Sequence, residues 1–470
     1  MNPKSFNLDE IKKYIISYNL NPKPSRPHPQ KNFITIPSAS ENNPLFIRKY
    51  LHSPHLNPND KFRIMSYNVL APSLAETHST FLSDSEKKHF DWSSRSKIIL
   101  QEIQYYDPDI LCLQEVDHDS TIFHENFEPF YFPFYHKRTN EKKDGCLTMV
   151  KKSKYRVLES HYLDFYQDIN HPILCRDNIC LLLAIQPLDF PNQIFIIANT
   201  HILYNKNRGD IKTAQIHLGL KACSKLAQKY QQKDVHIICT GDFNSTPKSP
   251  LYEFIKNAKF DFRDAAKNIL SGQTRTELRN QLSFESLEQF LIKNTNKFTL
   301  NPSYKEKKTH ELLTWIWCLK DLDVQIKKSP GNQIEKVEYE VIDLDPDIFR
   351  DSEEHLWTLE NDFPMQSAYS AFRKLYHGPM LPEYPIDCNC LEKSTYEPIC
   401  THRTIEALCT VDYIWYCTRD SKGGGRLEPV GIYEMPMLEE SWKRFKMFPN
   451  SVYPSDHLAL IVDFQVFLDS

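Results

Sequence analysis

The sequence predicts a layered α/β sandwich, in which helices cover buried sheets. Short continuous apolar runs, such as 109–116 and 235–240, are typical of strands that are buried on both faces. Between such runs, residues 93–106 and 212–230 place apolar side chains at helical spacing. Because strands and helices are mixed along the chain and several strands have no polar face, an α/β fold with covering layers fits best.

The expected elements begin at about residue 61. Ser249 and Pro250 open one helix, with serine in the capping position and proline at the first helical position. The other elements follow from apolar runs and from their periodicity. Strands are expected at 62–70, 109–116, 145–151, 178–186, 193–200, 235–240, 411–417 and 458–467, and helices at 93–106, 212–230 and from 249.

The chain divides into an extension and one main domain. Residues 1–60 are expected to form a partly disordered N-terminal extension, in which 6–20 has the pattern of a short helix. The main domain is expected over 61–468. It carries a long insertion at about 270–400, where Lys, Asn, Glu and Thr replace the apolar pattern.

The composition limits the partners and the compartment. The formal net charge of −4 excludes a chain that attracts nucleic acid through its overall charge, so a phosphate-rich substrate needs a local basic site or a metal ion. The 12 cysteines are spread irregularly, which favours buried thiols in a reducing compartment. Residues 1–20 lack a secretory or transit pattern, and no apolar run reaches membrane length. We expect a cytoplasmic or nuclear protein with no membrane partner.

Polar residues stand at the ends of several apolar strands. Taken singly, each has an ordinary explanation as a solvated residue, a turn, a cap or a structural histidine. Together, acids, amides and histidines at strand ends are the set that a metal-assisted hydrolase uses. The residues are Asn68, Glu115, His201, Asp242, Asn244, Asp456 and His457.

Six segments resemble, in order and spacing, the signature motifs of the endonuclease/exonuclease/phosphatase superfamily. They are MSYNVLA (65–71), LCLQEVD (111–117), NTHILYN (199–205), GDFNSTPKSPLY (241–252), VDYIWY (411–416) and SDHLAL (455–460). SYNVLA, with DGC at 144–146, is typical of the deadenylase-like branch. Within it, the chain resembles the Angel proteins most closely, through 176–187, 199–215 and 241–255.

The resemblance implies a four-layer fold, with two β-sheets packed face to face and helices outside (the DNase I-like fold), and a phosphoesterase that uses Mg²⁺, with Mn²⁺ as a substitute. Glu115 would be the main ligand of the ion, assisted by Asn68. Asp456 would hold a second or water-mediated ion. Hard cations of this kind prefer oxygen ligands.

The resemblance also implies catalytic roles. Asp242 would activate or orient the attacking water. His457 would contact the scissile phosphate or transfer a proton, and Asp412 would bond its other ring nitrogen. The sequence leaves the general base open. The donors to the phosphoryl oxygens would be Asn178, His201 and Asn244.

Two positions bear on the substrate. Deadenylases of this branch hold the terminal adenine with a proline five residues after the histidine of NTH and with a phenylalanine five before the aspartate of DY, where this chain has Lys206 and Ala407. Because base stacking contributes about 1–3 kcal/mol, poly(A) preference should be weakened. Lys206 and Arg208 are expected to bind a phosphate, with a solvated loop as the equal alternative.

Angel proteins are associated with removal of 2′,3′-cyclic phosphate from RNA 3′ ends, so the resemblance favours an RNA 3′-end phosphatase. A 3′–5′ exoribonuclease or poly(A) deadenylase is the alternative. A catalytically inactive RNA-binding scaffold and an enzyme that acts on a non-RNA phosphoester stay open as further readings. The RNA 3′ end is thus the expected partner.

The ends of the domain suggest no further assembly. Residues 1–60 are too few for a leucine-rich-repeat array, so we expect no entry into a deadenylase complex by that route and a monomer. Late in the chain, five metal-ligating side chains lack the spacing of a zinc finger or ribbon, which favours free cysteines. They are Cys388, Cys390, Cys400, His402 and Cys409.

Overall fold

The computed structural model describes most of the main domain. The helix expected at 6–20 and most of the insertion expected at 270–400 lie outside the described residues. These residues are 45, 48–79, 84–167, 169, 173–262, 267–273, 326–328, 358–376, 395–398, 400–404, 408–418, 425–435 and 448–467.

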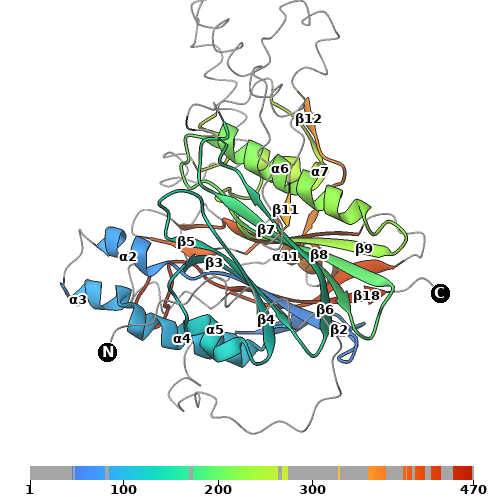
Figure 1. Cartoon of the computed structure of the whole chain (residues 1–470), viewed down its shortest axis with the longest axis horizontal. Helices are drawn as coiled ribbons and strands as arrows, with labels where there is room; N and C mark the ends of the chain where they lie inside the picture. The colour runs from blue at the N-terminus through green and yellow to red at the C-terminus, as the bar shows by residue number, and fades with distance from the viewer. Residues whose placement is uncertain are drawn as a thin grey trace, which may run out of the picture.

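Two mixed sheets of seven strands each form the body of the molecule (Figure 1). The first sheet has the order β1 (Tyr50–His52), β17 (Arg426–Tyr433), β18 (Leu460–Phe467), β2 (Lys61–Asn68), β3 (Ile110–Asp117), β5 (Asp144–Lys151) and β4 (Tyr131–Lys137). The second has the order β11 (Lys327–Lys328), β6 (Tyr155–Asp164), β7 (Ile179–Pro187), β8 (Gln193–His201), β9 (Asp234–Asp242), β16 (Asp412–Thr418) and β13 (Gln366–Ser367). Two short ribbons pair β10 (Lys259–Asp261) with β12 (Thr358–Glu360) and β14 (His402–Arg403) with β15 (Leu408–Cys409).

Helices cover the outer face of each sheet (Figure 1). α4 (Trp92–Tyr106) and α5 (Ile122–Phe127) lie on the first sheet, and α6 (Gly209–Gln228) and α7 (Pro250–Asn257) lie on the second. The other helices in the described part of the chain are α2 (Pro72–Ser79), α3 (Asp84–Lys87), the short 3₁₀ helix η2 (Lys88–Phe90) and α11 (Ala368–Tyr376). Among the described residues, no helix combines the length and the apolar character that a membrane span requires.

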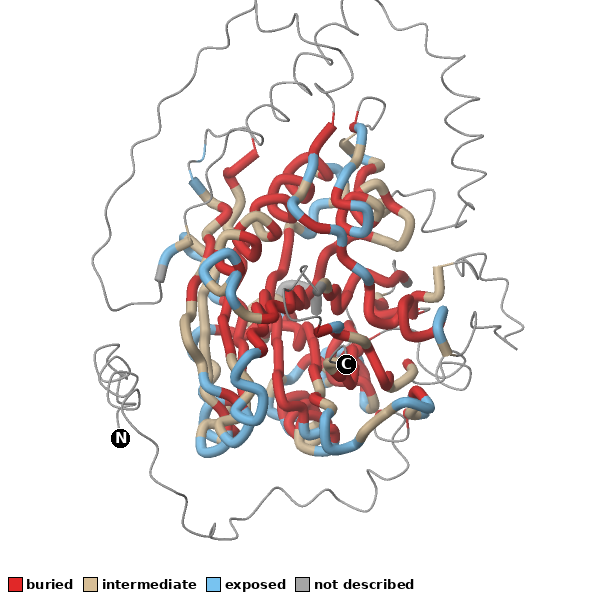
Figure 2. Tube along the Cα trace, turned by 90° about the vertical axis from the view of Figure 1, so that its right-hand side faces the viewer, coloured by how far each residue is buried: buried red, intermediate tan, exposed pale blue. Residues whose placement is uncertain are grey.

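Three buried apolar clusters define the layers. One cluster joins α6 and α7 to the second sheet, one lies between the sheets, and one joins α4 and α5 to the first sheet. Figure 2 shows these buried segments running through the interior, with most exposed residues in the outer turns. Layers of helix, sheet, sheet and helix confirm the predicted four-layer sandwich.

The elements predicted from continuous apolar runs are present, with bounds within three residues of those expected. Strands β4 and β6 were not predicted, because their side chains are mostly half-buried and give no apolar run. β17 was missed as well, since Pro429 interrupts its pattern. The N-terminal boundary expected at residue 61 is too late, because Tyr50–His52 pairs with β17 at the edge of the first sheet.

The insertion expected at about 270–400 is not wholly separate from the fold. Residues 366–376, inside that range, contribute β13 to the second sheet and the helix α11. Ala368, Tyr369 and Phe372 of α11 belong to the cluster between the sheets. This segment was missed because it is short and amphipathic, and tertiary contacts rather than a long apolar run stabilise it.

A buried amide bridges the two sheets below their common edge. The Asn199 Nδ2 of β8 donates to the carbonyl oxygens of Leu113 and Leu147, each at 3.1 Å, and lies 3.2 Å from Thr148 Oγ1. Gln114 Nε2 in turn donates to Asn199 Oδ1 at 2.8 Å. Polar groups inside an apolar interface are costly unless paired, so this bridge fixes the register of one sheet against the other.

Replacing the bridging amide should destabilise the protein strongly. Asn199→Ala removes the shortest hydrogen bond of Gln114 Nε2 and one donor to each of two carbonyl groups in a fully buried place, and we expect a loss of roughly 2–4 kcal/mol in the free energy of unfolding. Asp189→Ala, in the exposed turn after β7, should change it by less than about 0.5 kcal/mol. Urea unfolding measures both; equal values would contradict the structural role of the bridge.

Candidate active site

The ends of strands from both sheets converge on one buried cluster. In the second sheet, His201 and Asp412 are the neighbours of Asp242 in register, one on each side. Residues that pair across adjacent strands point to the same face, so the three side chains share a face. Asn68 ends β2 of the first sheet and reaches that face, with its Nδ2 3.3 Å from Asp242 Oδ2.

Glu115 is aimed into the cluster by an irregularity of its strand. The register of β3 against β5 shifts between Gln114 and Val116, and Glu115 has a positive φ of 56°. A bulge of this kind redirects one side chain out of the regular alternation. The Glu115 carboxylate then accepts from Asn68 Nδ2 at 3.0 Å and from the backbone N–H of Ala71 at 3.2 Å.

The Gly-Asp-Phe-Asn turn places Asp242 and Asn244. Gly241 has a φ of +139°, and a Cβ atom there would lie 1.8 Å from the Thr200 carbonyl oxygen, so only glycine fits. The backbone N–H of Asn244 donates to Asp242 Oδ1 at 2.9 Å. Asn244 Nδ2 lies 3.2 Å from His201 Nε2. The local sequence therefore fixes both side chains before any substrate binds.

The surroundings of His457 favour the protonated form of its imidazole ring. Its Nδ1 lies 2.8 Å from Asp412 Oδ2, while its Nε2 faces Asn68 Nδ2 at 3.4 Å and Asp242 Oδ2 at 3.7 Å. Burial lowers the pKa of His457, but the negative charges of Asp412 and Asp456 outweigh burial and the neighbouring His402, and raise this pKa to about 9. At neutral pH the ring is a proton donor.

The predicted substrate-binding residues take different places. Asn178 belongs to the support of the cluster, since its Nδ2 donates to the His201 backbone carbonyl at 2.9 Å. Arg208 bonds Asp210 at 2.9 Å with its guanidinium group, so this charge is already engaged at the start of α6. Lys206 is half-buried in the loop after β8. Contacts of all three with substrate stay predictions.

His402 lies beside the cluster, although the sequence pattern had suggested only a grouping with nearby cysteines. Its Nε2 lies 3.6 Å from Asp456 Oδ2, and its ring lies 4.5 Å from that of His457, centroid to centroid. The available signal was its position ten residues before Asp412, in the segment that leads into the VDYIWY strand. Cys400 and Cys409 are free, buried thiols; Cys388 and Cys390 lie outside the described residues.

The residues of the cluster suit a hard divalent cation. Glu115 and Asp242 are buried carboxylates, and among the described residues no lysine or arginine forms an ion pair with either. Histidines are their only ion-pairing partners in that part of the chain, with His201 Nδ1 3.8 Å from Glu115. Burying two neighbouring negative charges is costly, and a bound divalent cation offsets the part of that cost that the histidines leave.

Four layers with acids, amides and imidazoles at the strand ends define a class of protein, and comparison with known proteins gives its family. The chain belongs to the endonuclease/exonuclease/phosphatase family, whose model matches residues 65–457. A crystal structure of ANGEL2, a 2′,3′-cyclic phosphatase, is similar with a TM-score of 0.60 and 27% identity, over 89% of this chain and 97% of that one.

Curated relatives agree with this placement. Protein angel homolog 2 of Bos taurus is 39% identical over 222 residues, which are 46% of this chain and 40% of that protein. Protein angel homolog 1 of Homo sapiens is 28% identical and covers 87% of this chain, which spans 63% of that protein. Carbon catabolite repressor protein 4 homolog 3 of Arabidopsis thaliana is 27% identical, over 94% of this chain and 82% of that protein. The chain thus spans well under two thirds of its angel homolog 2 relative.

Removing the partner of His457 should lower the pKa of its ring. In Asp412→Asn, burial and His402 act against only the remaining charge of Asp456, so the pKa should fall from about 9 toward or below the ordinary histidine value. NMR titration of the ring, assigned with His457→Gln, measures it. Asp164→Asn, which affects the separate His136 pair, is the control; an unchanged His457 pKa in Asp412→Asn would contradict the pairing.

Proposed function

We propose that this chain is a Mg²⁺-dependent phosphoesterase that hydrolyses 2′,3′-cyclic phosphate at RNA 3′ ends. The cluster of Glu115, Asp242 and His457 carries the proposal, because its acids and imidazoles are those that a metal-assisted phosphoester hydrolysis needs. Similarity to ANGEL2, whose crystal structure in complex with adenosine-2′,3′-vanadate also has a TM-score of 0.60, supports the choice of substrate.

Glu115 and the neighbouring carboxylates would hold the ion by their oxygens. Asn68, expected as a ligand, presents its Nδ2 to Glu115 and Asp242 while its Oδ1 accepts from the Leu70 N–H at 3.1 Å, so it would act by orienting the carboxylates. When bound, Mg²⁺ (or Mn²⁺) supplies positive charge against the phosphate oxygens and so lowers the repulsion of an incoming nucleophile. The support of Glu115 by Asn68 and by the Ala71 N–H orients its carboxylate for that purpose.

Asp242 is placed to receive the proton of the attacking water. Its Oδ1 accepts from the Asn244 N–H at 2.9 Å, and its Oδ2 is the oxygen that faces the side chains of the cluster, with His457 Nε2 at 3.7 Å. Around Oδ2 stand Asn68 Nδ2 at 3.3 Å and His201 Nε2 at 3.4 Å. The Asn68 amide donates to Oδ2 and keeps the carboxylate oriented, and a carboxylate within reach of the water provides general-base catalysis.

His457 and the amides serve the phosphoryl group and the leaving oxygen. An imidazolium paired with Asp412 can donate its Nε2 proton and recover it between steps. The side-chain amide of Asn244 and the ring of His201 stand beside it as donors to negative charge that develops on phosphoryl oxygens.

The reaction consists of two balanced hydrolyses. In the first, water adds to phosphorus and one ribose oxygen leaves with a proton, so the ring opens to a phosphomonoester. In the second, another water adds, the remaining ribose oxygen leaves with a proton, and inorganic phosphate is released. The same base and the same acid serve both steps. In each step water attacks phosphorus, and the steps differ only in which ribose oxygen leaves.

A 3′–5′ exoribonuclease or deadenylase is the second candidate, favoured by similarity to the carbon catabolite repressor protein 4 homolog over 94% of this chain. Against it stands Lys206, a cation where an apolar base contact was expected; Ala407 lies outside the described residues. An inactive RNA-binding scaffold fits less well, because every cluster position holds a side chain that can act.

Two labelled RNAs with Mg²⁺ distinguish the candidates. One RNA ends in a 2′,3′-cyclic phosphate and the other in an oligo(A) tail with free hydroxyls. We expect dephosphorylation of the first without shortening, and no change in the second. A ladder of shortened products from the tail would assign the deadenylase activity instead, and no change in either RNA would support the scaffold. Chelation by EDTA should abolish turnover, and added Mg²⁺ should restore it.

Replacing the proposed base should remove turnover and keep the fold. Asp242→Asn preserves shape but cannot accept a proton, so kcat should fall by about 10²–10⁴-fold with little change in thermal stability. Asp189→Asn, an exposed change in the turn after β7 at the opposite end of that strand from the cluster, is the matched control. Activity of Asp242→Asn near that of the control would remove Asp242 from the mechanism.

A further inference from the structure

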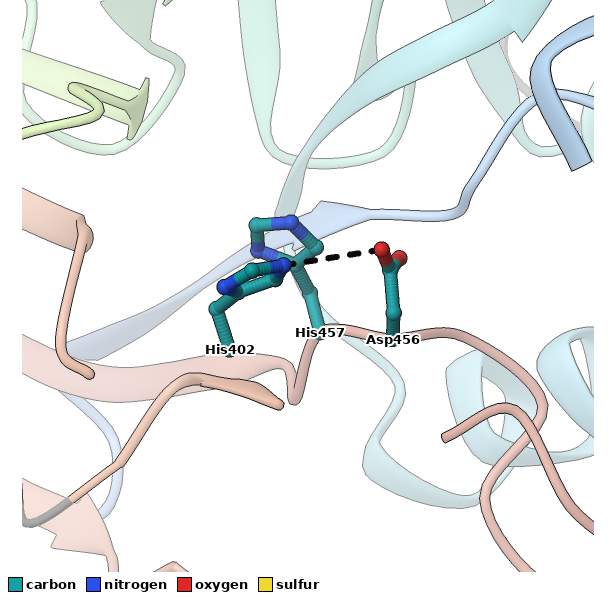
Figure 3. A group of neighbouring side chains, drawn as sticks. All are labelled: His402, Asp456 and His457. Atoms are coloured by element: carbon teal, nitrogen blue, oxygen red, sulfur yellow. Dashed lines mark ion pairs between the residues drawn. The ribbon is translucent and has the colours of Figure 1, made fainter. Parts of the chain in front are cut away.

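His402, Asp456 and His457 form a compact group beside the cluster of Glu115 and Asp242. Figure 3 shows the two imidazoles one above the other, with the carboxylate of Asp456 to one side. One ligand atom from each residue lies within 4.8 Å of the other two, and all three residues are buried. Two imidazoles and one carboxylate that converge in this way are a ligand set for a transition-metal ion.

Both imidazoles are oriented through their Nδ1 atoms. His457 Nδ1 lies 2.8 Å from Asp412 Oδ2, and His402 Nδ1 lies 3.8 Å from the thiol of Cys409. The Nε2 atom of each ring is then the one without this Nδ1 partner: His402 Nε2 faces Asp456 Oδ2 at 3.6 Å, and His457 Nε2 lies on the side of Asn68 and Asp242, 3.4 Å and 3.7 Å from their nearest side-chain atoms. Metal-binding histidines have this pattern, in which a partner on one ring nitrogen fixes the tautomer that the other nitrogen presents.

The backbone beneath the group is rigid. His402 and His457 pair as an antiparallel bridge, the Arg403 N–H donates to the Asp456 carbonyl at 2.8 Å, and the Leu458 N–H donates to the Thr401 carbonyl at 2.8 Å. The three side chains therefore come from two segments that hydrogen bonds hold side by side. A site on paired backbone loses little conformational freedom when an ion binds.

His402 and Asp456 form an ion pair whose separation also suits two ligands of one metal ion. His402 Nε2 and Asp456 Oδ2 are 3.6 Å apart, longer than a good hydrogen bond. Ligands about 2.0–2.1 Å from a tetrahedral Zn²⁺ lie roughly 3.4 Å from one another, close to the observed separation.

We propose that His402, Asp456 and His457 bind a transition-metal ion of the Zn²⁺ class, at a second site beside the oxygen-rich Glu115 site. Imidazole selects Zn²⁺ and its neighbours over Mg²⁺, whereas carboxylate and amide oxygens select Mg²⁺. The adjacent sites thus sort the two classes of ion by ligand chemistry. Asp456 serves the second site, through the oxygen that faces His402.

An ion at this site occupies the Nε2 atom of His457. Where the proposed function holds, the consequence is inhibition, because the coordinated ring can no longer exchange a proton with the substrate. Zn²⁺ should therefore lower turnover even with Mg²⁺ in excess, and this effect depends on His402.

Zinc binding is tested without substrate, so it does not depend on the proposed function. The whole chain is freed of metal and titrated with Zn²⁺ against a chromophoric chelator. We expect one equivalent to bind at this site, and His402→Ala to weaken that binding by at least about tenfold. His136→Ala is the matched control, because His136 forms a similar histidine–aspartate pair with Asp164 at 2.8 Å but has no second imidazole in the described group around it.

A further measurement separates this site from the cysteines. With Co²⁺ in place of Zn²⁺, nitrogen and oxygen ligands give no thiolate charge-transfer band. A strong band of that kind, zinc binding by His402→Ala equal to that of the unchanged chain, or no bound equivalent at all would each overturn the proposal. Where His402→Ala loses its fold by circular dichroism, His402→Gln, which keeps most of the volume, replaces it and must show the same weakening.

Discussion

Two carboxylates from different sheets face one amide group, and the rest of the site depends on that contact. Asn68 Nδ2 lies 3.0 Å from Glu115 Oε1 and 3.3 Å from Asp242 Oδ2. Like charges so close and so buried repel one another, and only a rigid frame with compensating donors and cations keeps them there. The sheet interface provides the frame, and the amide bridge of Asn199 lies directly beneath it.

Topology explains why the acids meet. In each sheet one pair of neighbouring strands is parallel, β2 with β3 and β8 with β9, so their carboxyl ends lie at one edge. Face-to-face packing then brings the two edges together, and β16 adds Asp412 from its first residue because it runs antiparallel to β9. Strand direction and sheet packing, rather than closeness along the chain, bring together residues separated by 174 positions, such as Asn68 and Asp242.

The sequence predicted the strands and site residues that follow a regular pattern of apolar and polar side chains. Strands buried on both faces appear as unbroken apolar runs, and a polar residue that follows such a run is visible as an exception, which is how Glu115 and Asp242 were found. Strands such as β4 and β6 have no such run, since half-buried side chains follow no strict alternation. The sequence did not predict that His402 lies beside the candidate active site. Its neighbours in the chain are cysteines, whereas its neighbours in space, Asp456 and His457, come from another segment. Asn178 has a structural role that the sequence did not predict, since its side chain donates to the His201 backbone carbonyl; its expected contact with substrate stays a prediction.

The chemistry and the selectivity of this fold lie on different parts of the chain. The acids, amides and imidazoles are buried on strand ends that the sheets fix, so they can change little without loss of the cluster. Lys206 and Arg208 lie on the loop between β8 and α6, where the pair of Arg208 with Asp210 joins one of the two charges to the start of α6. Ile202 and Leu203 of this loop pack on the core, but Lys206 and Arg208 are not members of the apolar clusters, so these two positions can exchange a base contact for a phosphate contact at little structural cost. Divergence in substrate among enzymes that share this cluster is therefore expected in such loops, while the hydrolysis itself stays the same.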